Sequence, residues 1–227
     1  MATWIGIDIG TTAIKVAVVR TAYRKRELTA LVSVDIGEVG PVPSMSVLAA
    51  PPSSTMRASR SVPPPPPELA GPTFDAIRHA VLLALGTGKG ATGDGVASSI
   101  PGDRVAVRVL SMPESVQKQL AEVLPFELES DVPFDMADSV FDYRILHDKA
   151  GAKTEVNVLA VVAPTELVKT RIDLVRAALG VEPERIGAAG FPLVHLVPFT
   201  PALDSATPVV VLDLGTRTSD ILVLLGG

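Results

Sequence analysis

The sequence of 227 residues contains no cysteine, which excludes disulfide bridges, thiolate nucleophiles and cysteine metal sites. It has no apolar run near the roughly 18 to 20 uncharged residues that span a bilayer. Its net charge of -5 provides no basic field for a phosphate backbone, so we expect no nucleic-acid partner. The N-terminus lacks the order of basic, apolar and small residues that marks a secretory signal. Together these absences predict a cytoplasmic protein that meets a membrane only through partners or through sequence outside this chain.

The 20 prolines are concentrated in one segment. Half of them fall within residues 41–72, and five are consecutive at Pro63–Pro67. Proline removes amide donors and favours extended backbone, and the serine, arginine and glycine between the prolines offer little apolar surface to offset the entropy of ordering. We therefore expect residues 41–72 to form a disordered loop. A ligand for proline-recognising modules is the alternative interpretation.

The rest of the chain shows strand and helix patterns. Alternating apolar residues over 5–9 and 14–19, separated by a Gly-Thr-Thr turn, predict a hairpin. Helical spacing predicts a surface helix over Phe74–Leu85. The patterns that follow predict a strand at 104–110, a helix from Pro113 that Pro125 kinks, strands at 140–146 and 156–162, and a helix from Pro164 to Gly180. The residues of this last helix that we expect to point inward are Val168, Ile172, Val175 and Leu179.

Two segments 205 positions apart share one pattern. Ile7-Asp8-Ile9-Gly10-Thr11 and Leu212-Asp213-Leu214-Gly215-Thr216 both place an aspartate between apolar residues ahead of a Gly-Thr pair. The second copy lies between two strand-like runs, Val209–Leu214 and Ile221–Leu225, and therefore predicts a second hairpin. A pattern repeated at this distance suggests a duplicated domain.

Each Gly-Thr turn exposes backbone amides and a hydroxyl in a small concavity that can hold phosphate oxygens. An aspartate just before the turn can hold a magnesium ion through water, and a nearby lysine adds a positive charge. The candidate nucleotide-binding residues are Asp8, Gly10, Thr11, Thr12, Lys15, Asp213, Gly215 and Thr216, with Asp8 as the magnesium candidate. The simpler alternative is that each motif only makes a good turn, but two copies in matching strand contexts favour phosphate binding.

These motifs resemble a known family. GIDIGTTAIKVAVV (residues 6–19) and VVVLDLGTRTSDILVL (residues 209–224) resemble the two phosphate motifs of the actin, sugar kinase and heat-shock ATPase superfamily. Residues 98–113, 124–146 and 156–194 resemble the inserted subdomain shared by PilM, GspL and FtsA. The resemblance covers nearly all of the chain except residues 41–72. It implies an α/β protein with an actin-like (ribonuclease H-like) subdomain, an inserted α+β subdomain, and a second actin-like half that is truncated.

The resemblance also implies a division into domains. Residues 1–102 would form the first part of the actin-like subdomain, and residues 103–182 the inserted α+β subdomain. The chain would then return to the first subdomain over residues 183–206, and residues 207–227 would begin the second actin-like subdomain.

The function that the resemblance implies is that of a cytoplasmic scaffold, peripheral at the inner membrane, in a type II secretion system (GspL-like) or a type IV pilus (PilM-like). Such a scaffold binds the cytoplasmic tail of an inner-membrane protein similar to PilN or GspM, and couples to a motor ATPase similar to GspE. We expect the tail to bind in a groove between the two subdomains, beside the apolar face of the helix at 114–124. The candidate groove residues are Arg104, Val105, Val107, Val116 and Leu120.

ATP and magnesium are the cofactors that the resemblance implies for the full-length protein. We expect this chain to bind ATP weakly or not at all, since the adenine-binding segment of a complete actin-like fold follows the second phosphate motif. We expect no catalytic role, because the candidate acids have the pattern of surface charges, namely Asp103, Glu114 and Asp142. The three histidines, His79, His147 and His195, lack the spacing of a metal site. An actin-like ATPase and an FtsA-like polymerising protein remain as alternatives.

Overall fold

The computed structural model describes residues 1–23, 25–38, 74–86, 93–146, 154–188, 190–196, 200 and 207–224. A five-stranded sheet forms its first subdomain. The strand order is β3-β2-β1-β4-β8. The first three strands are antiparallel neighbours, whereas β4 and β8 join in parallel. The strands are β1 (Ala2–Ile9), β2 (Ala13–Ala22), β3 (Lys25–Asp35), β4 (Gly95–Ile100) and β8 (Arg185–Ala188).

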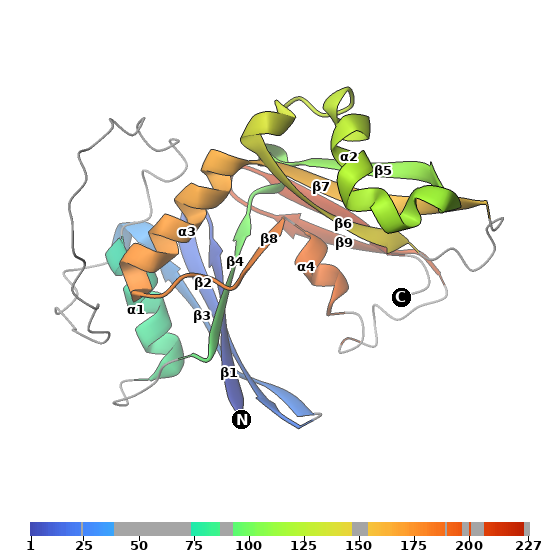
Figure 1. Ribbon diagram of the computed structural model, residues 1–227. Coiled ribbons are helices and arrows are strands. Elements are labelled where there is room, and N and C mark those ends of the chain that lie inside the picture. Colours follow the sequence, from blue (N-terminus) through green and yellow to red (C-terminus); the bar gives the residue numbers. More distant parts are fainter. Residues whose placement is uncertain are drawn as a thin grey trace, which may run out of the picture.

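Two helices, α1 (Phe74–Leu85) and α3 (Thr165–Leu179), cover one face of this sheet. They lie side by side, as Figure 1 shows. The alternating apolar residues of the first hairpin form one buried face of the sheet. Ile5, Ile7 and Ile9 lie beneath these helices together with alternate residues of β2. Helix α1 ends where the pattern predicts, and Ile77 on its inner face is fully buried.

Helix α3 differs from its predicted packing. Leu167, Arg171 and Leu174 are buried, whereas the predicted inward residues Val168 and Ile172 are only half-buried. The reason is that α3 contacts both the first sheet and the inserted strands. Leu174 packs in the core with α1, whereas Val168 lines a groove toward the inserted strands. The predicted inserted subdomain, residues 103–182, includes this helix, whose Leu174 packs in the core of the first sheet while Leu167 packs with Ala163 at the end of the inserted strands. The end of the helix is as predicted, with Gly180 at φ 76° and its N–H bonded to the carbonyl oxygen of Arg176.

A second, three-stranded antiparallel sheet in the order β5-β7-β6 forms the inserted subdomain. Its strands are β5 (Ala106–Pro113), β6 (Ser139–Leu146) and β7 (Glu155–Pro164). The helix predicted from Pro113 begins as a 3-10 helix, Glu114–Gln119, and continues as α2 (Leu120–Glu129). Leu120, Leu124 and Leu128 recur every four residues, are at most 1% exposed, and seal one face of this sheet.

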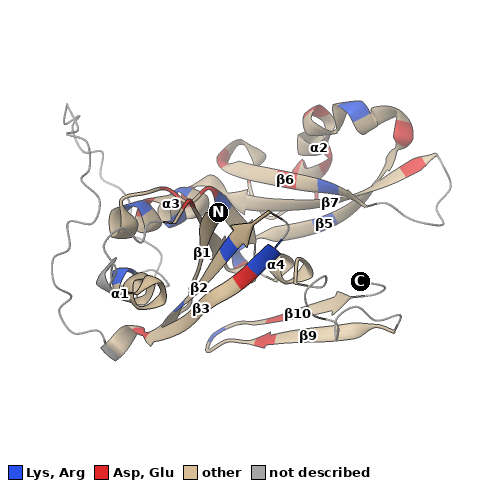
Figure 2. Cartoon of the chain, turned by 90° about the horizontal axis from the view of Figure 1, so that it is seen from below, with Lys and Arg blue, Asp and Glu red and all other residues tan. Residues whose placement is uncertain are grey.

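The third sheet is a hairpin of β9 (Val209–Leu214) and β10 (Ser219–Leu224). Figure 2 shows it as a ribbon set apart from the other two sheets. One of its faces stays open to solvent, with Leu212 56% and Ile221 70% exposed, whereas Leu224 at its end is buried. A short helix, α4 (Phe191–Val194), follows β8. The predicted loop at 41–72, together with His147 and Leu225, lies outside the described residues.

Strand β4 is one of three strands of the first sheet, with β3 and β8, that the sequence patterns do not predict. Its sequence, GVASSI, contains two serines, and Ser98 is nevertheless buried. The hydroxyl of Ser98 donates to the carbonyl oxygen of Ile7 at 3.0 Å, which satisfies the buried polar group. Among the helices of the described residues, none is long and apolar enough to span a membrane.

The core beneath α2 gives a stability prediction. Leu128 is fully buried, so Leu128→Ala should lower the free energy of unfolding by about 2 to 5 kcal/mol, as measured by denaturant titration. Phe126 lies on the same helix but is 75% exposed, so Phe126→Ala should change it by less than about 0.5 kcal/mol. Equal losses in the two variants would contradict the assignment of the α2 faces.

Candidate functional site

The two Gly-Thr turns have the same backbone geometry. The N–H of Gly10 donates to the carbonyl oxygen of Ala13 at 3.1 Å, and the N–H of Gly215 donates to that of Thr218 at 2.9 Å. A Cβ atom at Gly10 would meet the Ala13 oxygen at 2.9 Å, and at Gly215 it would meet the Thr218 oxygen at 2.8 Å. Glycine is therefore required at both positions for the turn to close.

The fold brings these turns together. The hydroxyl oxygens of Thr12 and Thr216 lie 3.0 Å apart, so one donates a hydrogen bond to the other. Both turns line a cavity of about 260 Å³. Every predicted nucleotide-binding residue lines this cavity, namely Asp8, Gly10, Thr11, Thr12, Lys15, Asp213, Gly215 and Thr216.

The two hairpins differ in the charge that lies across from the aspartate. Asp8 lies directly across from Lys15 in the first hairpin, whereas Asp213 lies across from Asp220 in the second. Burial raises the pKa of Asp220, and the negative charges of Asp213 and Asp103 raise it further. The second hairpin thus presents a pair of like charges where the first presents opposite charges.

Four further charged residues line the cavity that were not predicted to bind nucleotide. They are Asp103, Arg217, Asp220 and Arg171, the last of which is only 4% exposed. Spacing could have revealed Asp220, because it follows Asp213 by seven residues, as Lys15 follows Asp8. Asp103 and Arg171 carry no such signal, since the inserted strands and α3 bring them to the cavity from distant positions.

The residues present fit a phosphate group accompanied by a divalent cation. The cavity is lined by four carboxylates and three basic side chains, so an anion alone meets no excess of positive charge. A cation held through water by Asp8 or Asp213 would offset the carboxylates and leave Lys15 to contact phosphate oxygens. Within the described residues, no group of three or more acidic or histidine side chains is placed to chelate a metal directly.

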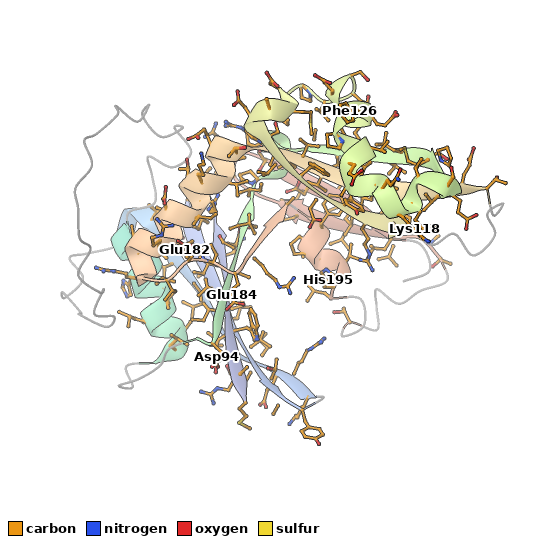
Figure 3. All side chains as sticks on the ribbon, in the orientation of Figure 1. Asp94, Lys118, Phe126, Glu182, Glu184 and His195 are labelled. Atoms are coloured by element: carbon orange, nitrogen blue, oxygen red, sulfur yellow. The ribbon has the colours of Figure 1, made fainter. Side chains whose placement is uncertain are left out.

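A second, larger hollow of about 1060 Å³ lies between the two subdomains. Strands β1, β2, β4 and β8 line one side, and β6, β7 and α3 line the other. Its apolar lining includes Leu31, Val140, Phe141, Val161, Val168 and Phe191. Glu184 and His195, labelled in Figure 3, are among its polar residues.

The five residues predicted for a peptide groove do not line this hollow. Leu120 is buried beneath α2, and Val116 packs against the same core. Val105 packs beside Ile100, while Arg104 ends a 3-10 turn and Val107 lies on β5. The apolar face of α2 covers its own sheet, and the part of these five residues in peptide binding stays a prediction.

The family model of the type IV pilus assembly protein PilM matches residues 74–227, which is more than half of the chain. The chain belongs to the PilM family. No curated protein sequence matches it significantly.

Solved structures agree with the fold of this PilM family member. A chain of a "PilM-PilN type IV pilus biogenesis complex" is similar with a TM-score of 0.66 and 22% identity, over 98% of this chain and 58% of that one. The cytoplasmic domain of EpsL, an inner-membrane component of the type II secretion system of Vibrio cholerae, is similar with a TM-score of 0.50 and 13% identity, over 97% of this chain and 71% of that one. The fold is the actin-like ATPase fold, and the chain spans 58% of the length of the first relative.

The charge pair of the second hairpin predicts a pH dependence. Because the pKa of Asp220 is raised in the folded protein, its ionisation costs stability as the pH rises above the usual aspartate pKa of about 3.9. Asp220→Asn should therefore raise the free energy of unfolding near neutral pH by roughly 0.2 to 1 kcal/mol, the cost of like charges directly opposite in a sheet. The gain in stability should vanish below the usual aspartate pKa, where the side chain at position 220 is uncharged in both the wild type and the variant.

The cause of the shift can be tested by NMR titration of the Asp220 carboxyl carbon. Asp213→Asn should lower its pKa more than Asp103→Asn does, whereas Asp138→Asn, an exposed residue before β6, should leave it unchanged. A pKa of Asp220 that ignores both cavity substitutions would contradict the proposed charge coupling.

Proposed function

We propose that this protein is a scaffold of a pilus or secretion assembly platform that binds an extended peptide from an inner-membrane partner in the groove between its subdomains. The single observation that carries the proposal is the groove of about 1060 Å³ with its largely apolar lining. Membership of the PilM family supports it, and so does the relative that was solved in a complex with PilN. The partner would be the cytoplasmic tail of a PilN-like or GspM-like protein, which would hold the scaffold at the inner membrane.

The groove is suited to an extended chain because two sheet edges border it. Strand β8 is the edge of the five-stranded sheet, and β6 is the edge of the three-stranded sheet. Residues of both strands line the groove, including Ile186 on β8 and Val140 on β6. An edge strand offers unpaired backbone groups to a peptide, while apolar pockets select alternate side chains. Main-chain pairing would supply affinity, and the pockets would supply specificity.

Coupling to a motor ATPase is the second part of this proposal. A partner of this kind needs a surface that a peptide in the groove leaves free. The outer face of α2 meets this need, because its residues do not line the groove and Phe126 is 75% exposed there. Phe126, labelled in Figure 3, lies on this face at the top of the inserted subdomain.

Peptide binding gives the main test. A synthetic peptide of the cognate partner's cytoplasmic tail should bind the chain in calorimetric titration. Val140→Arg should abolish binding, because Val140 lines the groove and is 41% exposed, so arginine would occupy the peptide's place without disturbing the core.

The matched control is Val109→Arg. Val109 lies on β5 of the same sheet and is 61% exposed, but it does not line the groove. This variant should bind the peptide as the wild type does, and both variants should keep its melting temperature within a few degrees. Undiminished binding to Val140→Arg would show that the peptide binds elsewhere.

Nucleotide binding is a second candidate function, favoured by the contact between the two Gly-Thr turns. In this chain the cavity of about 260 Å³ is smaller than the roughly 300 to 1,000 Å³ of typical ligand pockets. We therefore expect ATP with magnesium to bind with a Kd in the millimolar range or weaker, about -4 kcal/mol. We expect no sustained hydrolysis, in line with a scaffold and not an actin-like ATPase or an FtsA-like polymer.

A fluorescent ATP analogue, titrated with magnesium against the wild type and Asp8→Ala, tests this expectation. The wild type should show weak binding that Asp8→Ala lowers further, because the substitution removes the candidate magnesium residue. Micromolar binding that is lost in Asp8→Ala would show a complete nucleotide site in this chain.

A further inference from the structure

The turn between β2 and β3 gathers positive charge and exposed apolar groups. Arg20, Lys25 and Arg26 are all exposed at this end of the hairpin. Tyr23 projects fully into solvent, and Leu28 is 59% exposed. The N-terminal ammonium group is close by, because Ala2 pairs with Thr21, and the side chain of Met1 is also fully exposed. Glu27 is the acidic residue of this turn, 3.8 Å from Lys25.

The backbone of this turn suggests that Tyr23 has a role outside the fold. Tyr23 has a φ of 58°, in the left-handed region that bulky side chains rarely adopt. Glycine or asparagine would fit this position with less strain. Since the ring is fully exposed, it contributes nothing to the core that would offset the strain. Strained backbone is concentrated at functional sites, so the conformation of Tyr23 points to a role outside the core.

Charge is distributed unevenly over the molecule. Residues 114–142, which include α2, contain eight acidic residues and one lysine, whereas the rest of the chain has a slight basic excess. All eight acidic residues are exposed. Figure 1 places α2 at one end of the molecule and the β2–β3 turn, beside the N-terminus, at the other. In the field of an anionic surface, this arrangement turns the β2–β3 end toward the surface and α2 away from it.

We propose that the β2–β3 turn binds the surface of an anionic lipid bilayer. Lysine and arginine are attracted to anionic headgroups, and tyrosine is favoured at the boundary between headgroups and acyl chains. Met1 and Leu28 add exposed apolar groups toward the same end of the hairpin. The sequence alone predicts membrane contact through partners or through sequence outside this chain, whereas this turn would make a direct contact. The inference is independent of peptide binding in the groove.

The test uses the 227-residue chain and sedimentation with lipid vesicles. Vesicles of phosphatidylcholine with roughly 30 mol% phosphatidylglycerol should bind the protein, and vesicles of phosphatidylcholine alone should not. Binding should be lost in about 0.5 M NaCl, because salt screens the attraction. Inorganic phosphate at millimolar concentration should not compete, since the turn binds a charged surface and not a single anion. Equal binding to neutral and anionic vesicles, or to neither, would overturn the proposal.

Substitutions locate the contact. Each cation near an anionic leaflet strengthens binding on the order of fivefold, so the double variant Lys25→Gln, Arg26→Gln should bind roughly 25-fold more weakly. The matched control Lys118→Gln, Lys169→Gln changes the net charge equally at exposed sites on the 3-10 helix Glu114–Gln119 and on α3, and should bind like the wild type. Equal weakening in both double variants would overturn the assignment.

Tyr23→Asn separates a binding role from a structural one. Asparagine tolerates the left-handed turn, so the melting temperature should stay the same or rise while vesicle binding weakens severalfold. Unchanged vesicle binding would exclude Tyr23 from the contact.

The acidic face of α2 in a second copy is the competing partner for this turn. Analytical ultracentrifugation tests for this partner. Salt-sensitive self-association would favour it and overturn the lipid proposal if two double variants both abolish the association. One is Lys25→Gln with Arg26→Gln, and the other is Glu127→Gln with Glu129→Gln.

Discussion

The parallel pairing of β1 with β4 is the constraint on which the rest of the structure depends. It joins residues 4–7 to residues 95–98, so the end of β1 and the end of β4 lie at the same edge of the sheet. The first Gly-Thr turn leaves from one end, and the inserted subdomain leaves from the other. The side chains of Asp8 and Ser99 meet there, with 3.4 Å between their oxygens. One pairing therefore places the cavity, the groove and the inserted sheet around a single sheet edge.

Elements with strong local patterns could be predicted from the sequence, and elements stabilised by tertiary contacts could not. Helix α1 and both hairpins were predicted because their apolar period is clear, and the end of α3 was predicted from Gly180. Strand β4 was missed because its buried Ser98 has the appearance of a loop residue until its hydrogen bond to β1 is known. Strand β3 was missed because its first residues are charged and exposed at a sheet edge.

The candidate site divides in the same way. The two turns could be predicted because sequence repetition reports the shared backbone geometry of Gly10 and Gly215 directly. The groove residues could not be predicted, because a period of 3.6 shows that one face of a helix is apolar but not which surface that face meets. In α2 the face meets its own sheet. The groove is lined instead by residues on the opposite face of that sheet, such as Val140 and Val161, whose neighbours are set by the arrangement of the two subdomains.

The cavity and the groove share a wall. Asp8, Lys15, Ser99 and Ile100 line both hollows, from the ends of β1, β2 and β4. A ligand that displaces these residues from either side changes the shape of the other hollow. Thermodynamic linkage then requires a reciprocal effect. If one ligand changes the affinity of the second by a given factor, the second changes the affinity of the first by the same factor. With ligands in both hollows, the shared wall would make the occupancy of one measurable as a change of affinity in the other.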